Sequence, residues 1–164
     1  MSSKLQPALL GGLLIGVLSA LPFVSVLNGC CCLWVILGGV LTSYLLQEQS
    51  RVPLTGGTAA VAGLQAGMVG AVVAAILGAA VMALMGGGAE QFDQLPQGDI
   101  PPQLAAVLER FRELPPAVWY VGPFLVYIII FPIFSALGAL LGVAIFKKTP
   151  PPPPPGTVEI LPPE

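Results

Sequence analysis

The feature that most constrains the fold of this chain is an uncharged stretch from Thr58 to Leu84, 27 residues long, of which 14 are Gly or Ala. As an α-helix it would be about 40 Å long, which exceeds the roughly 30 Å hydrocarbon core of a bilayer. Its small residues recur at helical spacing, for example Gly63 and Gly67, and such spacing lets two membrane helices approach closely. The stretch therefore predicts a membrane-spanning helix that packs through its small residues.

The composition of the whole chain favours a membrane protein. Of its 164 residues 55% are hydrophobic and 9% are charged, and the mean hydropathy is +0.90. Soluble domains carry about 25% charged residues, and a soluble chain this short has too little interior for so much apolar surface. The net charge of −2 offers no basic surface for nucleic acid. We therefore expect the lipid bilayer, and no nucleic acid, as a partner.

Three further apolar segments complete the predicted fold. Asn28-Gly29 is a turn dipeptide between the first two, so these should pair as an antiparallel helical hairpin, with Pro22 loosening the first helix near its end. The fold class is predicted to be all-α: one integral membrane domain, residues 1–148, with four transmembrane helices in two hairpins. The predicted spans are residues 8–27, 30–46, 58–84 and 119–146.

Glycines at helical spacing are predicted to make the contacts between these helices. They are Gly12, Gly16, Gly38, Gly39, Gly63, Gly67, Gly70, Gly138 and Gly142. Gln65 is the most polar side chain within residues 58–84, and we expect it to form a polar contact across a helix interface. The sequence around Gly12 resembles that around Gly63, which either duplication of one hairpin or chance similarity of apolar helices would explain.

Two segments are predicted to lie outside the membrane. Within the acidic segment 89–116, apolar residues at 3.6-residue spacing predict an amphipathic helix over residues 102–114, either on the membrane surface or covering one end of the bundle. The tail, residues 149–164, begins with six consecutive prolines at 150–155 and is predicted to be disordered. It is either a spacer or a ligand for a partner with an aromatic groove.

Charge places both termini on the cytoplasmic side of a bacterial inner (cell) membrane. In that orientation Lys4, Arg51, Lys147 and Lys148 are cytoplasmic, as the positive-inside rule favours. Lys4 followed by an apolar run also resembles a secretory signal, and Leu27–Cys30 resembles a lipoprotein cleavage site. The single cation and the apolar segment that follows favour retention of residues 8–27 as the first span.

The chain offers little for catalysis. It has no histidine, the predicted spans contain no Asp, Glu, Lys or Arg, and no catalytic or nucleotide-binding motif occurs. We expect no enzymatic activity, no cofactor and no metal. Cys30, Cys31 and Cys32 have three readings: small packing residues, a site of disulfide formation or lipidation, or a metal site, which would lack a fourth ligand.

The first hairpin resembles small bacterial polytopic membrane proteins that share a Leu-Pro-Phe…Asn…Cys-Cys-Leu-Trp…Gly-Gly pattern, over about Gly11 to Leu46. The resemblance brings no activity with it. We expect a non-enzymatic structural or accessory subunit of the membrane, within a homo-oligomer or a larger complex. The alternative is a small oligomeric transporter or pore for a neutral solute, for which the polar residues of the spans are sparse.

Overall fold

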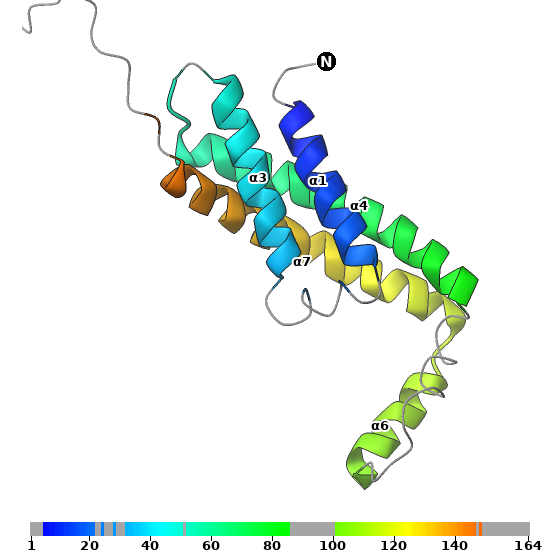
Figure 1. Cartoon of the computed structure of the whole chain (residues 1–164). Helices are drawn as coiled ribbons and strands as arrows, with labels where there is room; N and C mark the ends of the chain where they lie inside the picture. Colours follow the sequence, from blue (N-terminus) through cyan, green and yellow to red (C-terminus); the bar gives the residue numbers. More distant parts are fainter. Residues whose placement is uncertain are drawn as a thin grey trace, which may run out of the picture.

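The computed structural model describes residues 5–21, 24, 28, 32–50, 52–85, 101–146 and 148. Within these residues the chain has five α-helices and no strand, which confirms the all-α fold class (Figure 1). The helices are α1 (Leu5–Ala20), α3 (Leu33–Gln49), α4 (Gly56–Met85), α6 (Pro102–Arg112) and α7 (Pro116–Ile145).

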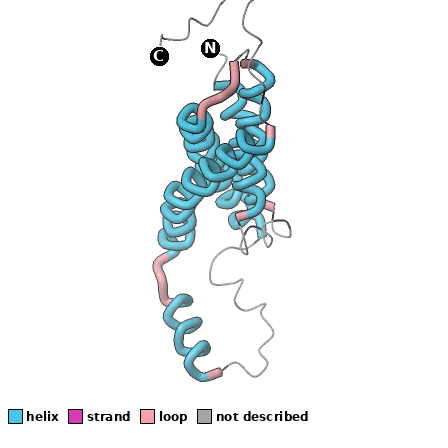
Figure 2. The backbone as a smooth tube through the Cα atoms, turned by 90° about the vertical axis from the view of Figure 1, so that its left-hand side faces the viewer, coloured by secondary structure: helices cyan, strands magenta, loops and turns pink. Residues whose placement is uncertain are grey.

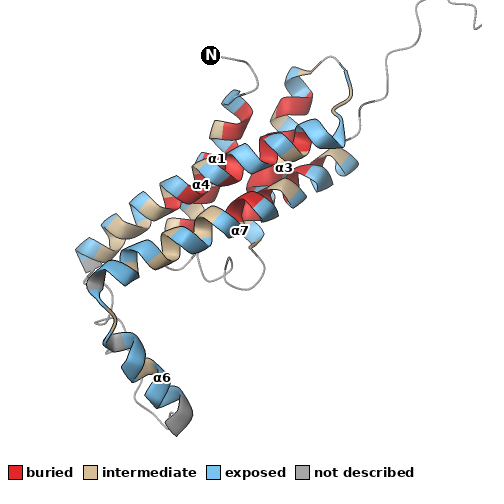
Figure 3. Cartoon of the chain, turned by 180° about the vertical axis from the view of Figure 1, so that it is seen from behind, coloured by how far each residue is buried: buried red, intermediate tan, exposed pale blue. Residues whose placement is uncertain are grey.

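Four of these helices pack together as two crossed pairs. The helices α4 and α7 run antiparallel and side by side, and the antiparallel pair α1 and α3 crosses them obliquely (Figure 1). Helix α1 packs on α4, and α3 packs mainly on α7. Buried residues concentrate where the two pairs cross (Figure 3). The core cluster draws on all four helices and consists of Ile15, Val35, Ala71, Ala74 and Phe131.

Two helices are long and apolar enough to cross a membrane: Gly56–Leu84 and Ala117–Ile145, each of 29 residues. In their most apolar windows only 22% and 33% of the residues are buried inside the chain. The core helix of a soluble protein would instead be mostly buried, so the outward apolar surface of α4 and α7 suits lipid. Helix α1 is a shorter apolar helix.

The ends of α1 differ from the predicted span of 8–27. The helix starts at Leu5, before Pro7, which is tolerated because the first turn of a helix has amides without an intrahelical partner. It stops at Ala20, since Leu21 precedes Pro22 and a residue before proline disfavours the helical conformation.

The connection between α1 and α3 is longer than the predicted two-residue turn. Asn28 is itself helical, and its carbonyl oxygen accepts a hydrogen bond from the Cys32 amide at 2.9 Å. Cys32 then takes a left-handed conformation with φ of 48° at the start of α3. The prediction of a two-residue connection is therefore wrong, and α3 starts at Leu33 rather than at residue 30; Gly29 itself lies outside the described residues. The predicted antiparallel pairing of α1 and α3 is present (Figure 1).

The ends of α4 lie within two residues of the predicted span 58–84, and those of α7 within three of 119–146. Helix α7 continues through both Pro123 and Pro132. Helix α6 matches the predicted amphipathic helix but ends at Arg112, and it extends away from the four packed helices rather than across their end (Figures 1 and 2). The predicted Pro-rich tail lies outside the described residues.

Candidate functional site

The centre of the molecule is a set of close helix crossings at glycines. A contact is close here when a methyl group built on the glycine would overlap atoms of the next helix. The predicted glycines all lie at such crossings, but successive glycines often face different helices. Gly38, for example, faces Ile15 of α1, whereas its neighbour Gly39 faces Ser135 of α7.

Helices α1 and α4 both contribute glycines to the contact between them. A Cβ atom on Gly12 would lie 2.7 Å from the Ala66 carbonyl oxygen, and one on Gly16 would lie 2.5 Å from Val73 Cβ. From the other side, a Cβ atom on Gly70 would lie 2.6 Å from Ile15 Cγ2. Ile15 is fully buried, so it fills the space that Gly70 leaves open.

Helix α7 meets both α3 and α4 through glycines. Gly138 and Gly142 face Ile36, Val40 and Ser43 of α3. On α4, a Cβ atom at Gly63 would lie 2.7 Å from the Ser135 carbonyl oxygen, and one at Gly67 would lie 2.5 Å from Pro132 Cα. These neighbours are backbone atoms, which cannot move aside as a flexible side chain can.

Sequence reasoning missed Gly11. This residue faces Thr42 and the Gly38 carbonyl oxygen of α3, so it makes the same kind of contact as its neighbour Gly12 on the other side of α1. The signal that could have found it is the Gly11-Gly12 pair, because adjacent residues lie about 100° apart around a helix and can serve two neighbours.

Buried hydroxyl groups at the crossings bond mainly within their own helix. Thr42 Oγ1 donates to the Gly38 carbonyl oxygen at 2.8 Å, and Ser43 Oγ donates to that of Val40 at 2.9 Å. Ser135 is fully buried, and its Oγ has no hydrogen-bond partner among the described residues. These hydroxyl groups therefore do not link the helices, and close apolar packing has to hold them together.

A cavity of about 360 Å³ lies at the end of the crossing where α1 stops and α3 starts. Its polar wall contains Ser19, Asn28 and Cys32, and its apolar wall comes from α7, including Tyr127 and Phe131. Asn28 Nδ2 donates to Ser19 Oγ at 3.1 Å, while Asn28 Oδ1 is buried without a partner in the described part of the chain.

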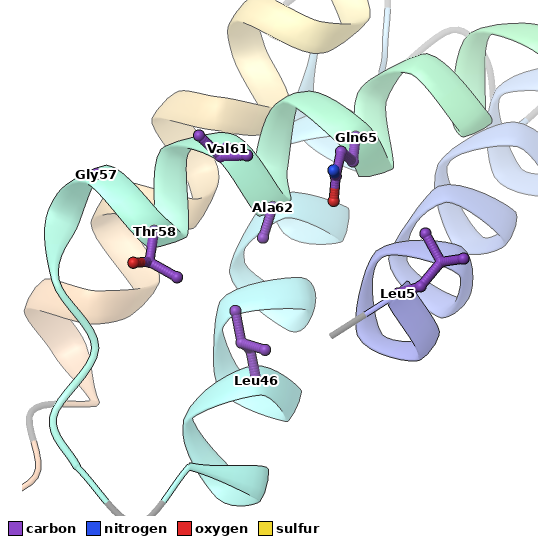
Figure 4. A pocket seen from close by; sticks show the side chains of 7 residues that line it. All are labelled: Leu5, Leu46, Gly57, Thr58, Val61, Ala62 and Gln65. Carbon is purple, nitrogen blue, oxygen red and sulfur yellow. The ribbon is translucent and has the colours of Figure 1, made fainter. Parts of the chain in front are cut away.

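A larger cavity of about 560 Å³ lies at the opposite end, between the start of α4, the start of α1 and the end of α3 (Figure 4). It is mostly apolar and includes Leu5, Leu46 and Val61, with Thr58 and Gln65 as its polar side chains. Gln65 is exposed and lines this cavity, and its side chain makes no hydrogen bond to any other described residue. Its predicted interhelical contact stays a prediction.

A lysine connects three segments at the same end of the molecule. Lys148 Nζ donates to the carbonyl oxygens of Gln47, at 2.6 Å, and Ser50, at 3.4 Å. These oxygens lie at the C-terminal end of α3, where the helix dipole favours a positive charge. Gln47 is buried, and its Oε1 accepts a hydrogen bond from the Leu54 amide at 3.3 Å. The end of α7, the end of α3 and the loop after it are thereby joined.

Of the three cysteines, only Cys32 lies within the described residues. It is half-buried and packs against the core cluster of Ile15, Val35, Ala71, Ala74 and Phe131. Within the described part of the chain, no three His, Cys, Asp or Glu residues lie close enough to hold a metal ion. Cys30 and Cys31 lie outside the described residues, and the three roles considered for the cysteines stay predictions.

The comparisons with known proteins identify a family. The model of a family described as the MJ1491 transmembrane domain matches residues 5–149, which include every helix described above. No curated protein and no solved structure matches the chain. The match confirms the resemblance to a membrane-protein family that the first hairpin indicated, and together with α4 and α7 it makes this a membrane protein.

Proposed function

The chain belongs to the MJ1491 transmembrane domain family, and we propose that it is a non-enzymatic integral membrane protein that acts as a structural or accessory subunit. In this proposal α1, α3, α4 and α7 all cross the bilayer, as two hairpins. Both termini lie on the cytoplasmic side of the inner membrane.

The observation that carries the structural role is the close contact at the crossing. Gly39 of α3 and Gly63 of α4 both face the carbonyl oxygen of one α7 residue, Ser135. Three helices thus meet with no side chain of substantial size between them. Such a centre has no room for a substrate, and the apolar stretches of the helices around it contain no Asp, Glu, Lys or Arg. It suits a rigid scaffold that presents its outer surface to lipid and to partner proteins.

The helices differ in length, but all four can cross the same bilayer if the pair α4 and α7 is tilted more than the pair α1 and α3. At 1.5 Å per residue the 29-residue spans of α4 and α7 are about 43 Å long, and the 16 residues of α1 are about 24 Å long. A helix longer than the hydrocarbon core of about 30 Å is accommodated by tilting. The oblique crossing of the two pairs supports tilted α4 and α7 beside a more upright α1 and α3 (Figure 1).

The orientation is supported by where the helix ends meet. Leu5 of α1, Leu46 of α3 and Gly57 of α4 all line the same cavity, and Lys148 bonds to the end of α3. The start of α1 and the end of α7 therefore lie at one end of the molecule. The cations Lys4, Arg51, Lys147 and Lys148 are near that end in sequence, as expected for a cytoplasmic side.

The experiment that tests the role is copurification from native membranes in a mild detergent, followed by mass spectrometry. A subunit should retain stoichiometric copies of itself or of another membrane protein. The Gly67→Ala variant, which separates α4 from α7, should lose them, whereas Gly78→Ala, at an open position of the same helix, should not. Recovery of a partner-free monomer from native membranes, with α4 and α7 intact, would overturn the proposal.

A second candidate function is transport of a small neutral solute, and one specific observation favours it. The two cavities open at opposite ends of the crossing, and the buried hydroxyl of Ser135 lies in the packed region between them. Glycerol flux from proteoliposomes, compared with empty vesicles, tests this function. Flux above the empty-vesicle rate that falls in Ser135→Ala would favour transport over the structural role.

A further inference from the structure

Helix α6 carries an apolar face that the other described helices leave about half exposed. Leu104, Val107 and Phe111 lie on this face and are 50%, 49% and 46% exposed. Among the described residues, α6 does not pack along α1, α3 or α4 (Figures 1 and 2). Glu109 lies on the opposite side at 100° per residue, and Glu113 follows directly after the helix. An exposed amphipathic helix of this kind needs an apolar surface to cover it.

The position of α6 relative to α7 limits what that surface can be. Helix α6 ends at Arg112 and α7 starts at Pro116, so the three residues between them can extend at most about 10 Å. Trp119 and Tyr120, in the first turn and a half of α7, are the residue types that favour the headgroup level of a membrane. The C-terminal end of α6 is therefore held close to the membrane surface.

An aromatic contact links the apolar face of α6 to that level. The rings of Phe111 and Trp119 lie with their centroids 6.4 Å apart and their planes at 52°. Since Trp119 belongs to the start of a membrane span, Phe111 lies at nearly the same depth. The apolar face of α6 thus adjoins the start of α7 at Phe111.

We propose that α6 lies in the plane of the membrane interface, with Leu104, Val107 and Phe111 in the boundary between headgroups and acyl chains. In the structure α6 extends away from the four packed helices, so the proposal requires rotation about residues 113–115 (Figure 1). The occupant is the lipid surface itself. This inference does not depend on whether the protein is a structural subunit or a transporter.

The charge of α6 indicates how it binds lipid. Within α6, Glu109 offsets one of the two arginines, Arg110 and Arg112, and Glu113, directly after the helix, offsets the other, so residues 102–113 have no net charge. Basic amphipathic helices gain much of their binding from anionic lipids. Here burial of the apolar face has to supply the interaction, and binding should be the same on neutral and on anionic membranes.

The test uses the full chain in phosphatidylcholine vesicles, with Cys30, Cys31 and Cys32 replaced by serine and one new cysteine carrying a nitroxide label. Val107→Cys reports on the apolar face, and Ala106→Cys is the matched control on the other side of α6. Oxygen partitions into lipid and a neutral nickel chelate into water, so collisions with each relaxant locate the label. Leu104→Cys gives a second reporter on the apolar face, should the Val107 variant misfold.

The label at Val107 should collide with oxygen several-fold more than the label at Ala106, and with the nickel chelate several-fold less. Replacing a third of the lipid by phosphatidylglycerol should leave both values unchanged. Equal nickel accessibility at the two positions would place α6 in water and overturn the proposal. Low accessibility of Val107 to both relaxants would mean that protein covers the face, which would also overturn it.

Discussion

At the scale of single residues, glycine contributes to this protein because it has no side chain, which lets neighbouring helices approach closely. In lipid the hydrophobic effect does not drive apolar helices together, so association depends on van der Waals contact and on a few hydrogen bonds. Gly63 and Gly67 allow the backbone of α7 to touch that of α4. By contrast, a Cβ atom at Gly78 would have nothing within 4 Å, so not every glycine of α4 serves packing.

Gly67→Ala is expected to destabilise the protein by about 1–3 kcal/mol, the usual cost of overpacking, because the new methyl group would lie 2.5 Å from Pro132 Cα. Gly78→Ala is the matched control on the same helix, and it should leave stability unchanged or raise it by up to about 1 kcal/mol through helix propensity. Thermal unfolding in detergent, followed by near-UV circular dichroism, measures both. Equal effects at the two positions would contradict the role given to Gly67.

Ser135→Ala is expected to leave the unfolding free energy unchanged or to raise it by about 1–3 kcal/mol, since it removes a buried hydroxyl without a described partner. Thr42→Val should instead lower it by about 1 kcal/mol, because Thr42 Oγ1 donates a hydrogen bond to the Gly38 carbonyl oxygen. Denaturant titration of both variants in the same detergent gives the comparison. A marked loss of stability in Ser135→Ala would mean that its hydroxyl has a bonded role.

At the scale of helices, the ends are set by local chemistry and joined by a few long-range contacts. Helix α1 stops before Pro22, and α3 starts after the left-handed Cys32. The C-terminal end of α3 is held from a distant part of the sequence, because Lys148 donates to the carbonyl oxygens of Gln47 and Ser50. That contact fastens the last helix to the first hairpin.

Lys148→Ala is expected to lower the unfolding free energy by about 0.3–1 kcal/mol at low ionic strength, the usual range for a cation at a helix C-terminus. The loss should shrink as salt is added, because screening weakens the interaction of the charge with the helix dipole. Lys148→Arg keeps the charge and should recover part of the loss. A salt-independent loss that Lys148→Arg does not reduce would show that packing, and not charge, explains the effect.

At the scale of the whole molecule, an apolar surface surrounds a tightly packed crossing. Large apolar side chains are exposed on each of the four packed helices, for instance Leu13, Leu37, Leu64 and Ile129. In water such a surface would cause association, whereas in a bilayer lipid tails cover it. The family match and the two long apolar helices place the chain in a membrane, and the proposed topology then assigns a side to each end.

The proposed topology predicts which cysteines a membrane-impermeant maleimide can reach in intact cells. The native cysteine segment 30–32 and Ala106→Cys should react from outside, whereas Ser50→Cys, in the cysteine-free background, should react only after the membrane is permeabilised. Labelling is read from the mass shift of the protein on a gel. Reaction of Ser50→Cys in intact cells would contradict the cytoplasmic placement. A native cysteine segment that reacts only after permeabilisation would argue against α1 and α3 crossing the bilayer.

Sequence patterns alone predicted the all-α class, the membrane family and nearly the right bounds for α4 and α7. Long uncharged stretches allow few folds other than a membrane helix, which is why those predictions succeeded. The connection at Asn28-Gly29 was predicted wrongly, because turn propensity is local, while contacts such as Asn28 with Ser19 depend on the rest of the structure.

Spacing marked glycines that lie at helix crossings, but only the tertiary structure decided which helix each of them faces. Gly38 and Gly39 are neighbours in sequence and face α1 and α7, and Gly11 and Gly12 divide in the same way between α3 and α4. The physical reason is that a glycine contact is a property of two surfaces. The sequence of one helix shows where its side chains are small and leave space on its surface. The way the helices cross determines which neighbouring backbone fills that space.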